Sequence, residues 1–213
     1  MNVKRDHEIA GSAAGTLEAT PGSASRALRE GPIPPGPFDV AVIGAGVVGA
    51  AIARDLSLRG ASCVLVEAGI DVGAGTSKAN TAILHTGYDT KPGTIESELV
   101  PRGYELLAEY AERVGIPVST IGALMVAWTP EQAAALPGIE RNARQVGITD
   151  TRAVEIDELY RREPALGEGA AGCLEVPGEG IICPFTTALA LATEAMMAGC
   201  RLALRARVVG VYP

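Results

Sequence analysis

The most regular hydrophobic pattern in the chain predicts a strand, a helix and a second strand in succession. Residues 38–43 are rich in apolar and β-branched side chains, and residues 62–66 repeat that composition. The segment between them begins with closely spaced glycines, is rich in alanine and ends at Gly60, as expected for a helix. The pattern therefore predicts a βαβ unit.

A second helical pattern covers residues 94–114, where apolar side chains recur at helical spacing. These side chains are Ile95, Leu99, Leu106, Leu107, Tyr110 and Val114. Pro101 falls inside the segment. Because proline lacks an N–H and clashes with the preceding turn, we expect a kink or two short helices here.

The middle of the chain alternates between strand and helix signals. Residues 123–128 form a β-like run, and residues 129–132 (Thr-Pro-Glu-Gln) have the composition of a helix N-terminus, with the threonine as cap. We expect that helix to stop near Pro137 and a short helix to follow over residues 139–146.

The last part of the chain predicts a short helix from Asp157, a strand over residues 172–176, a helix over residues 184–197 and a strand over residues 201–211. The long helix stops at Gly199. A helix that ends in glycine and leads into a β-rich run is typical of a crossover to a third parallel strand.

These elements predict an α/β fold of two domains interleaved in sequence. We expect a nucleotide-binding domain built from residues 38–118 and 184–213, with residues 119–183 inserted from a second domain. Residues 1–37 are rich in Gly, Ala, Ser and Pro and show no apolar period. We expect them to be a disordered extension that contributes nothing to the fold.

The glycines after the first strand have the spacing of a dinucleotide-binding turn. Gly44 permits a tight turn, Gly46 leaves room for a pyrophosphate, and Gly49 lets the helix pack close to the sheet. The helix N-terminus offers N–H groups to phosphate. Glu67 follows Gly49 by 18 residues, near the spacing of an acid that binds an adenosine ribose. The alternative is an ordinary βαβ unit with small residues at its turn.

Composition and charge narrow the function classes. The chain has 213 residues, of which 47% are hydrophobic and 4% aromatic, and its net charge is −7. This acidic balance argues against nucleic acid, and no stretch approaches the roughly 20 apolar residues of a membrane span. The four cysteines are far apart and the chain has only two histidines, so we expect reduced thiols and no metal site. We expect a cytoplasmic protein without an integral membrane segment, with a peripheral position at the inner membrane face as the alternative.

Residues 68–93 form a loop too long for a plain connector, which points to a function. Its hydroxyl groups at Thr76 and Ser77 suit a polar ligand, although such residues also cap local turns. Asn80 fits a ligand contact or a left-handed turn equally well. His85 is the one histidine after residue 37. It could act as a base, donate to a ligand, or be satisfied by backbone.

With these motifs in view, the chain resembles flavoproteins of the D-amino-acid-oxidase-like superfamily, in the branch of glycerol-3-phosphate dehydrogenase and L-2-hydroxyglutarate oxidase. The resemblance rests on DVAVIGAGVVGAAIARDLSLRG, GTSKANTAILHTGY, KPGTIESELV, GALMVA and GEGIICPFTTALALATEAMMAGC. It implies a Rossmann-like FAD-binding domain interleaved with part of an α+β substrate domain, truncated at its C-terminus.

The resemblance also implies FAD as the cofactor and assigns residues to it. The implied set comprises Gly44, Ala45, Gly46, Val48, Gly49, Glu67, Ala68, Thr76, Ser77, Asn80, Ala82, Ile83, Leu84 and His85. In this assignment the glycines line the pyrophosphate, Glu67 holds the ribose, and residues 82–85 approach the isoalloxazine. His85 is the candidate catalytic residue. Tyr88 and Lys91 could reach a substrate anion, with a solvated loop as the alternative, and Cys183 is expected to pack at a helix start.

The implied activity is oxidation of a CH–OH group of a small molecule by hydride transfer to flavin. Glycerol 3-phosphate is the first candidate substrate, and an L-2-hydroxy acid such as L-2-hydroxyglutarate is the alternative. Because proteins of this kind continue beyond this length, a separate chain could supply the C-terminal half. A non-catalytic dinucleotide-binding remnant is a further alternative, and an NAD-binding dehydrogenase domain is a weaker one.

Overall fold

A computed structural model describes residues 28–31 and 33–211. These residues form two compact units. The first unit comprises the described residues up to Asp71 together with those from Leu191 onward, and the second unit comprises Val72–Ala190. We describe each unit by itself.

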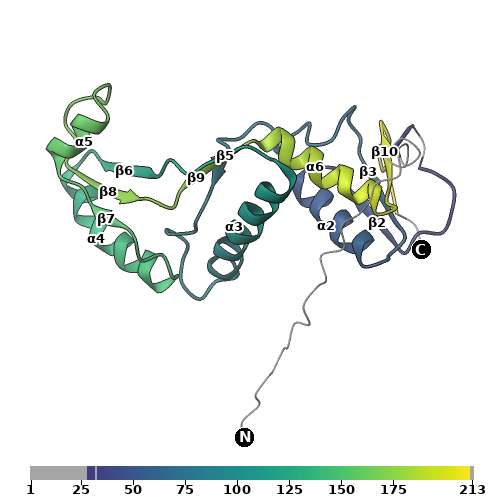
Figure 1. The fold of residues 1–213 in the computed structure, drawn as a ribbon, viewed down its shortest axis with the longest axis horizontal. Coiled ribbons are helices and arrows are strands. Elements are labelled where there is room, and N and C mark those ends of the chain that lie inside the picture. Colours follow the sequence, from purple (N-terminus) through teal and green to yellow (C-terminus); the bar gives the residue numbers. More distant parts are fainter. Residues whose placement is uncertain (1–27, 32, 212–213) are drawn as a thin grey trace, which may run out of the picture. The chain divides into compact units, whose positions relative to one another are not determined.

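The first unit is built on a four-stranded parallel sheet (Figure 1). Its strands are β1 (Leu28–Glu30), β2 (Val40–Ile43), β3 (Cys63–Val66) and β10 (Arg201–Leu204), in the order β1-β10-β3-β2. β10 pairs in parallel with β3 although 134 residues separate Val66 from Arg201. The expectation of a third parallel strand reached by a crossover is therefore confirmed.

The core of the first unit lies around β3. All residues of β3 are about 1% exposed, which is typical of a parallel strand covered on both faces. Helix α2 (Val47–Leu58) packs against β2 and β3, with Ala50 and Ala53 fully buried. Such small side chains let the helix lie close to the sheet. Arg54 of α2 also forms an ion pair with Glu194 near the end of the chain.

The second unit contains two three-stranded antiparallel sheets. The first sheet has the order β4-β9-β5 and consists of β4 (Ile83–Leu84), β9 (Gly180–Ile182) and β5 (Val118–Ser119). The second sheet has the order β6-β8-β7 and consists of β6 (Ala123–Ala127), β8 (Gly172–Val176) and β7 (Arg152–Ala153). Its helices are α3 (Ile95–Val114), α4 (Pro130–Gln145) and α5 (Ile156–Arg162), and α6 (Pro184–Met197) begins here and ends in the first unit. Figure 1 shows α4 lying along β6 and β8, which it contacts.

Both internal prolines lie within continuous helices. α3 contains Pro101 and α4 contains Pro137, so the expected pair of short helices at Pro101 and the expected stop at Pro137 are wrong. Each proline removes one backbone bond, and tertiary packing outweighs that loss. Pro101 lies against the 87–88 turn, where a Cβ on Gly87 would come 3.1 Å from its Cδ. α4 packs closely on β8: a Cβ added to Gly172 of β8 would lie only 3.0 Å from the side chain of Leu136 in α4.

Two expectations at the ends of the sheet also need correction. Leu28–Glu30 pairs with β10, so this part of the expected N-terminal extension contributes to the fold, while residues 1–27 lie outside the described residues. β10 ends at Leu204 rather than continuing to residue 211. Arg205 has a φ of 54°, and a left-handed residue ends the extended conformation of the strand.

The two compact units are interleaved in sequence, because the first unit ends at Asp71 and resumes at Leu191. The division into a nucleotide-binding domain (residues 38–118 and 184–213) and an inserted second domain concerns function and stays a prediction. The long loop after Glu67 and helix α3 therefore belong to the second unit, together with the two antiparallel sheets.

We predict that Gly49→Ala destabilises the protein, because an added Cβ would lie 1.9 Å from the carbonyl oxygen of Gly44. Relief of such an overlap costs about 1–3 kcal/mol. The control is Gly103→Ala in α3, where an added Cβ meets nothing within 4 Å. The free energy of unfolding of this control should increase by up to about 1 kcal/mol, because alanine has a higher helix propensity than glycine. Urea unfolding of both variants measures the difference, and equal midpoints would contradict the packing role of Gly49.

Candidate functional site

The turn between β2 and α2 has the backbone geometry that its glycines predict. Gly44 has a φ of 99°, which favours glycine, and its N–H donates to Val66 O at 2.8 Å. Gly46 is the N-cap of α2 in an extended conformation, with φ −70° and ψ 175°. Gly49 approaches Gly44 too closely for any side chain. The chain therefore passes from strand to helix in a tight turn that requires glycine at positions 44 and 49.

Glu67 joins this turn to the end of β3. Its Oε2 accepts a hydrogen bond from the N–H of Ala45 at 2.8 Å, and its Oε1 accepts one from the N–H of Gly69 at 2.6 Å. A carboxylate has about four acceptor positions. The two bonds to backbone N–H groups therefore leave further acceptor positions on the Glu67 carboxylate.

The start of α2 suits an anion. No side chain caps Gly46, and the first turn contains no acidic residue. The positive end of the helix dipole and the first-turn N–H groups are therefore not offset by a carboxylate of that turn. Val48 is 69% exposed and Ala45 is fully buried. The side chain of Val48 is therefore accessible from solvent, whereas the side chain of Ala45 is not.

In the second unit, residues 76–82 form a turn that Asn80 holds together. Its Nδ2 donates to the carbonyl oxygens of Thr76 and Ser77 at 3.1 and 2.9 Å, and its Oδ1 accepts the N–H of Ala82 at 2.7 Å. The side chain of Asn80 therefore shapes the turn, but Asn80 is not the left-handed residue that the sequence suggested, because the described non-glycine residues with a positive φ are Ala82 and Arg205. Thr76 is exposed and Ser77 is half-buried.

The next residues show how the chain enters β4. Ala82 has a φ of 61°, a conformation that costs a residue with a Cβ about 1 kcal/mol or more. Its carbonyl accepts the N–H of Ile182 at 2.9 Å, which fixes the turn to β9. Ile83 is then 54% exposed and Leu84 only 4% exposed. Leu84 thus lies in the protein core, and Ile83 presents an apolar surface.

His85 lies between two carboxylates. Its Nδ1 is 3.0 Å from Glu179 Oε1, and its Nε2 is 3.0 Å from Asp89 Oδ1. Glu179 Oε1 also accepts the N–H of Thr86 at 2.7 Å and the hydroxyl of Thr86 at 2.6 Å. The ring of Tyr88 meets the imidazole edge-on at 5.4 Å between centroids. Burial first, and then the charges of Asp89 and Glu179, raise the pKa of Tyr88 to about 12.

Sequence reasoning did not find Glu179 or Asn142, which hold this region in place. Glu179 is separated from His85 by 94 residues. Asn142 donates through Nδ2 to the carbonyl oxygens of Tyr88 and Thr90 at 3.1 and 2.8 Å. A pattern based on local spacing cannot detect such contacts. The one available signal for Glu179 is an acid placed between two glycines at the start of a β-rich run.

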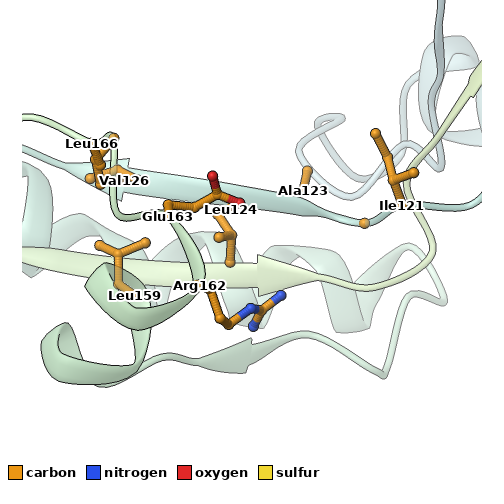
Figure 2. Close-up of a pocket in the computed structure, with 9 residues that line it drawn as sticks. Ile121, Ala123, Leu124, Val126, Leu159, Arg162, Glu163 and Leu166 are labelled. Atoms are coloured by element: carbon orange, nitrogen blue, oxygen red, sulfur yellow. The ribbon is translucent and has the colours of Figure 1, made fainter.

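A separate pocket of about 370 Å³ lies between β6, α5 and the segment after α5 (Figure 2). Its wall includes Leu124, Val126, Leu159 and Leu166. Arg162 borders it, but its guanidinium is paired with Glu158 and Glu175. Hydrogen bonding from Arg162 holds the pKa of the Glu175 carboxyl below its usual range. None of the predicted cofactor residues lines this pocket.

Two further features are absent from the described residues. Over residues 28–31 and 33–211, no group of at least three His, Cys, Asp or Glu side chains is placed to hold a metal ion. In the same part of the chain, no helix combines the length and apolar character needed to cross a membrane.

Comparison with known proteins decides the family. Residues 39–212 match the family model described as "FAD dependent oxidoreductase" (DAO). The chain belongs to this family. FAD is therefore the family's cofactor, and the assignment of the α/β fold to FAD-binding oxidoreductases is confirmed.

Relatives within the DAO family include enzymes of both expected kinds. Glycerol 3-phosphate dehydrogenase of Caloramator mitchellensis is 34% identical over 82% of this chain and 36% of its own length. L-2-hydroxyglutarate dehydrogenase of Arabidopsis thaliana is 37% identical over 60% of this chain and 26% of its own length. The chain thus spans between about a quarter and about a third of the length of these relatives.

Solved structures agree with the fold. L-α-glycerophosphate oxidase from Mycoplasma pneumoniae, solved with FAD bound, has a TM-score of 0.75 at 27% identity and covers 79% of this chain and 44% of its own. Glycine oxidase from Geobacillus kaustophilus has a TM-score of 0.69 at 30% identity, with 79% and 46% covered. Both matches cover less than half of the known structure.

Cys183 lies at the start of α6 and differs chemically from the other cysteines. The hydroxyl of Thr186 donates to its Sγ at 3.1 Å, and this bond, with N–H donors of Thr186 and Phe185, lowers the pKa of the Cys183 thiol. Burial instead raises the pKa of Cys200 to about 11. The expected packing position at the helix start is therefore accompanied by greater thiol acidity.

We predict that iodoacetamide alkylates Cys183 before Cys200 near neutral pH, because the thiolate is the reactive form and a lower pKa enriches it. Thr186→Val removes the hydroxyl donor and should slow alkylation of Cys183. Thr187→Val is the control, since that hydroxyl donates to the carbonyl of Cys183 at 2.8 Å and not to its sulfur. Peptide mass spectrometry follows the rates, and equal slowing by both variants would contradict the prediction.

Proposed function

We propose that this chain binds FAD and forms the cofactor-binding part of an oxidoreductase that oxidises a CH–OH group of a small molecule. The observation that carries the proposal is the glycine turn, in which Gly49 lies against the backbone of Gly44 and the Glu67 carboxylate accepts the N–H of Ala45. The family match over residues 39–212 supports FAD over NAD as the dinucleotide.

The residues of the first unit fit the adenosine diphosphate part of FAD. The N-terminus of α2 presents backbone N–H groups to the pyrophosphate, and Gly46 provides a close approach without a side chain. Glu67 retains acceptor positions for the ribose hydroxyls. Its negative charge disfavours a 2′-phosphate, and Ala68 follows it at the exposed edge of the site.

Residues of the second unit are assigned to the remainder of the cofactor. Thr76 and Ser77 would contact the pyrophosphate and ribityl chain, with Asn80 shaping the turn that presents them. Ala82, Ile83, Leu84 and His85 would lie toward the isoalloxazine, Ile83 by its side chain and Leu84 by its backbone. FAD, when bound, supplies the ring that accepts a hydride from the substrate carbon.

His85 is the proposed acceptor of the hydroxyl proton. Its imidazole is 35% exposed, and it follows β4 directly. Neutral imidazole is a suitable base near pH 7. Asp89 competes for Nε2 in this structure, but its own side chain is 51% exposed, and such exposed pairs contribute little stability. A substrate hydroxyl can therefore displace it.

Glycerol 3-phosphate is the proposed substrate. The match to glycerol 3-phosphate dehydrogenase extends over 82% of this chain, and the structural neighbour with a TM-score of 0.75 is a glycerophosphate oxidase. An L-2-hydroxy acid is the second candidate, favoured by 37% identity to L-2-hydroxyglutarate dehydrogenase. We propose that turnover also requires segments that these longer relatives have beyond the matched part. In this proposal a separate chain can supply those segments.

We predict that the chain retains FAD after desalting and that Gly46→Val abolishes this retention. The valine side chain would occupy the space of the pyrophosphate. Cys183→Ala is the control and should retain flavin as the unsubstituted chain does. Visible absorbance of the desalted proteins gives the bound fraction. Equal retention by the two variants would contradict the assigned pyrophosphate turn.

We predict that ADP displaces FAD at least about tenfold better than its 2′-phosphorylated analogue, corresponding to about 1.4 kcal/mol. The physical reason is repulsion between the 2′-phosphate and Glu67. Flavin fluorescence in competition titrations measures the displacement of FAD by each of the two ligands. Glu67→Gln should narrow the ratio because the repulsive charge is lost. An equal ratio for the unsubstituted chain and Glu67→Gln would show that Glu67 does not face the ribose.

A further inference from the structure

Glu179 is a buried carboxylate whose position is fixed from several directions. Its side chain is 5% exposed. Its N–H donates to Val176 O at 3.3 Å and its carbonyl accepts the N–H of Gly122 at 2.8 Å. The neighbouring Gly178 carbonyl accepts the hydroxyl of Tyr104 at 2.9 Å, so α3 also holds this turn. Backbone bonds thus set the place of Glu179 without any contribution from its carboxylate.

The turn is also built to bring Glu179 close to β4. A Cβ on Gly178 would lie 3.1 Å from Cγ2 of Thr86, so the glycine permits close contact with the residue after His85. One carboxylate oxygen, Oε1, then accepts the N–H and the hydroxyl of Thr86 and lies 3.0 Å from Nδ1 of His85. A carboxylate only accepts hydrogen bonds, so the contact with Nδ1 is a hydrogen bond when that nitrogen carries the proton.

The two carboxylates on His85 do not act with equal strength. Glu179 is 5% exposed and Asp89 is 51% exposed, at the same distance of 3.0 Å from their ring nitrogens. Water and salt screen the exposed carboxylate, whereas the buried one acts through a lower effective dielectric. In neutral imidazole a single proton remains, and the stronger acceptor retains it. That acceptor is Glu179, on the Nδ1 side.

We propose that Glu179 is a positioning residue that holds the His85 proton on Nδ1 and thereby leaves Nε2 as the accepting nitrogen. The proposal gives Nε2, on the side of the exposed Asp89, the role of receiving the substrate hydroxyl proton. Its catalytic meaning rests on the proposed function, but the position of the ring proton does not. Tyr88 also lies against the imidazole, and its raised pKa of about 12 keeps the phenol uncharged.

The test is ¹⁵N NMR of the histidine ring nitrogens in the full 213-residue chain without flavin at pH 9, where an unperturbed imidazole is neutral. We expect a protonated-type shift for Nδ1 and an unprotonated-type shift for Nε2 of His85. His7 is the second histidine of the chain, and His85→Gln assigns the signals. A proton on Nε2 in the unsubstituted chain would overturn the proposal.

Two matched amide variants distinguish the effects of the two carboxylates on the ring proton of His85. Glu179→Gln keeps the size of the side chain and removes its charge, and it should reduce the population with the proton on Nδ1. Asp89→Asn makes the same chemical change on the other nitrogen and should leave the proton on Nδ1. An unchanged shift in Glu179→Gln would overturn the proposal. If that variant does not fold, the unsubstituted chain and Asp89→Asn still decide it by the position of the proton.

Flavin retention by the same proteins distinguishes this proposal from the proposed function. Glu179→Gln should retain FAD, since no step of cofactor binding is assigned to Glu179. A chain that shows the expected Nδ1 proton but does not retain flavin supports the role of Glu179 and rejects the FAD assignment. A chain that retains flavin but carries the His85 proton on Nε2 supports the FAD assignment and rejects the role of Glu179.

Discussion

The arrangement of the first unit depends on the carboxylate of Glu67. It accepts the N–H of Ala45 from the glycine turn and the N–H of Gly69 from the loop after β3. The carbonyl of Glu67 also accepts the N–H of Ala206 at 2.9 Å, which ties the end of β3 to the segment after β10. One residue therefore fixes the helix N-terminus, the end of β3 and the final described segment. Charge-assisted bonds to backbone N–H groups are stronger than neutral ones.

Glu179 has a comparable role within the second unit. Its carboxylate accepts one backbone N–H, that of Thr86, and it lies directly before β9. The two acids differ in what remains available on them. Glu67 is half-buried and retains acceptor positions toward solvent, whereas Glu179 is buried and directs its Oε1 to Thr86 and His85. Glu67 is thus suited to hold a ligand and Glu179 to orient a side chain.

Sequence patterns predicted those parts of the fold that local chemistry determines. The glycine turn, the threonine cap of α4 and the bounds of β8 and α6 follow from residues close together in the chain, and the structure shows them. The continuity of α3 and α4 through Pro101 and Pro137 depends on packing against Gly87 and β8, which local sequence patterns do not contain. Contacts between distant residues, such as Glu179 with His85, could not be predicted from spacing. Among the candidate site residues, the local bonds of Asn80 now favour a turn role.

We infer above all that residues 44–49 and 67–69 of the first unit bind the adenosine diphosphate part of FAD. Backbone hydrogen exchange of the full chain, measured with and without added FAD, tests this inference directly. We predict slower exchange in both segments when FAD is present. Unchanged exchange in these two segments would contradict FAD binding by this chain.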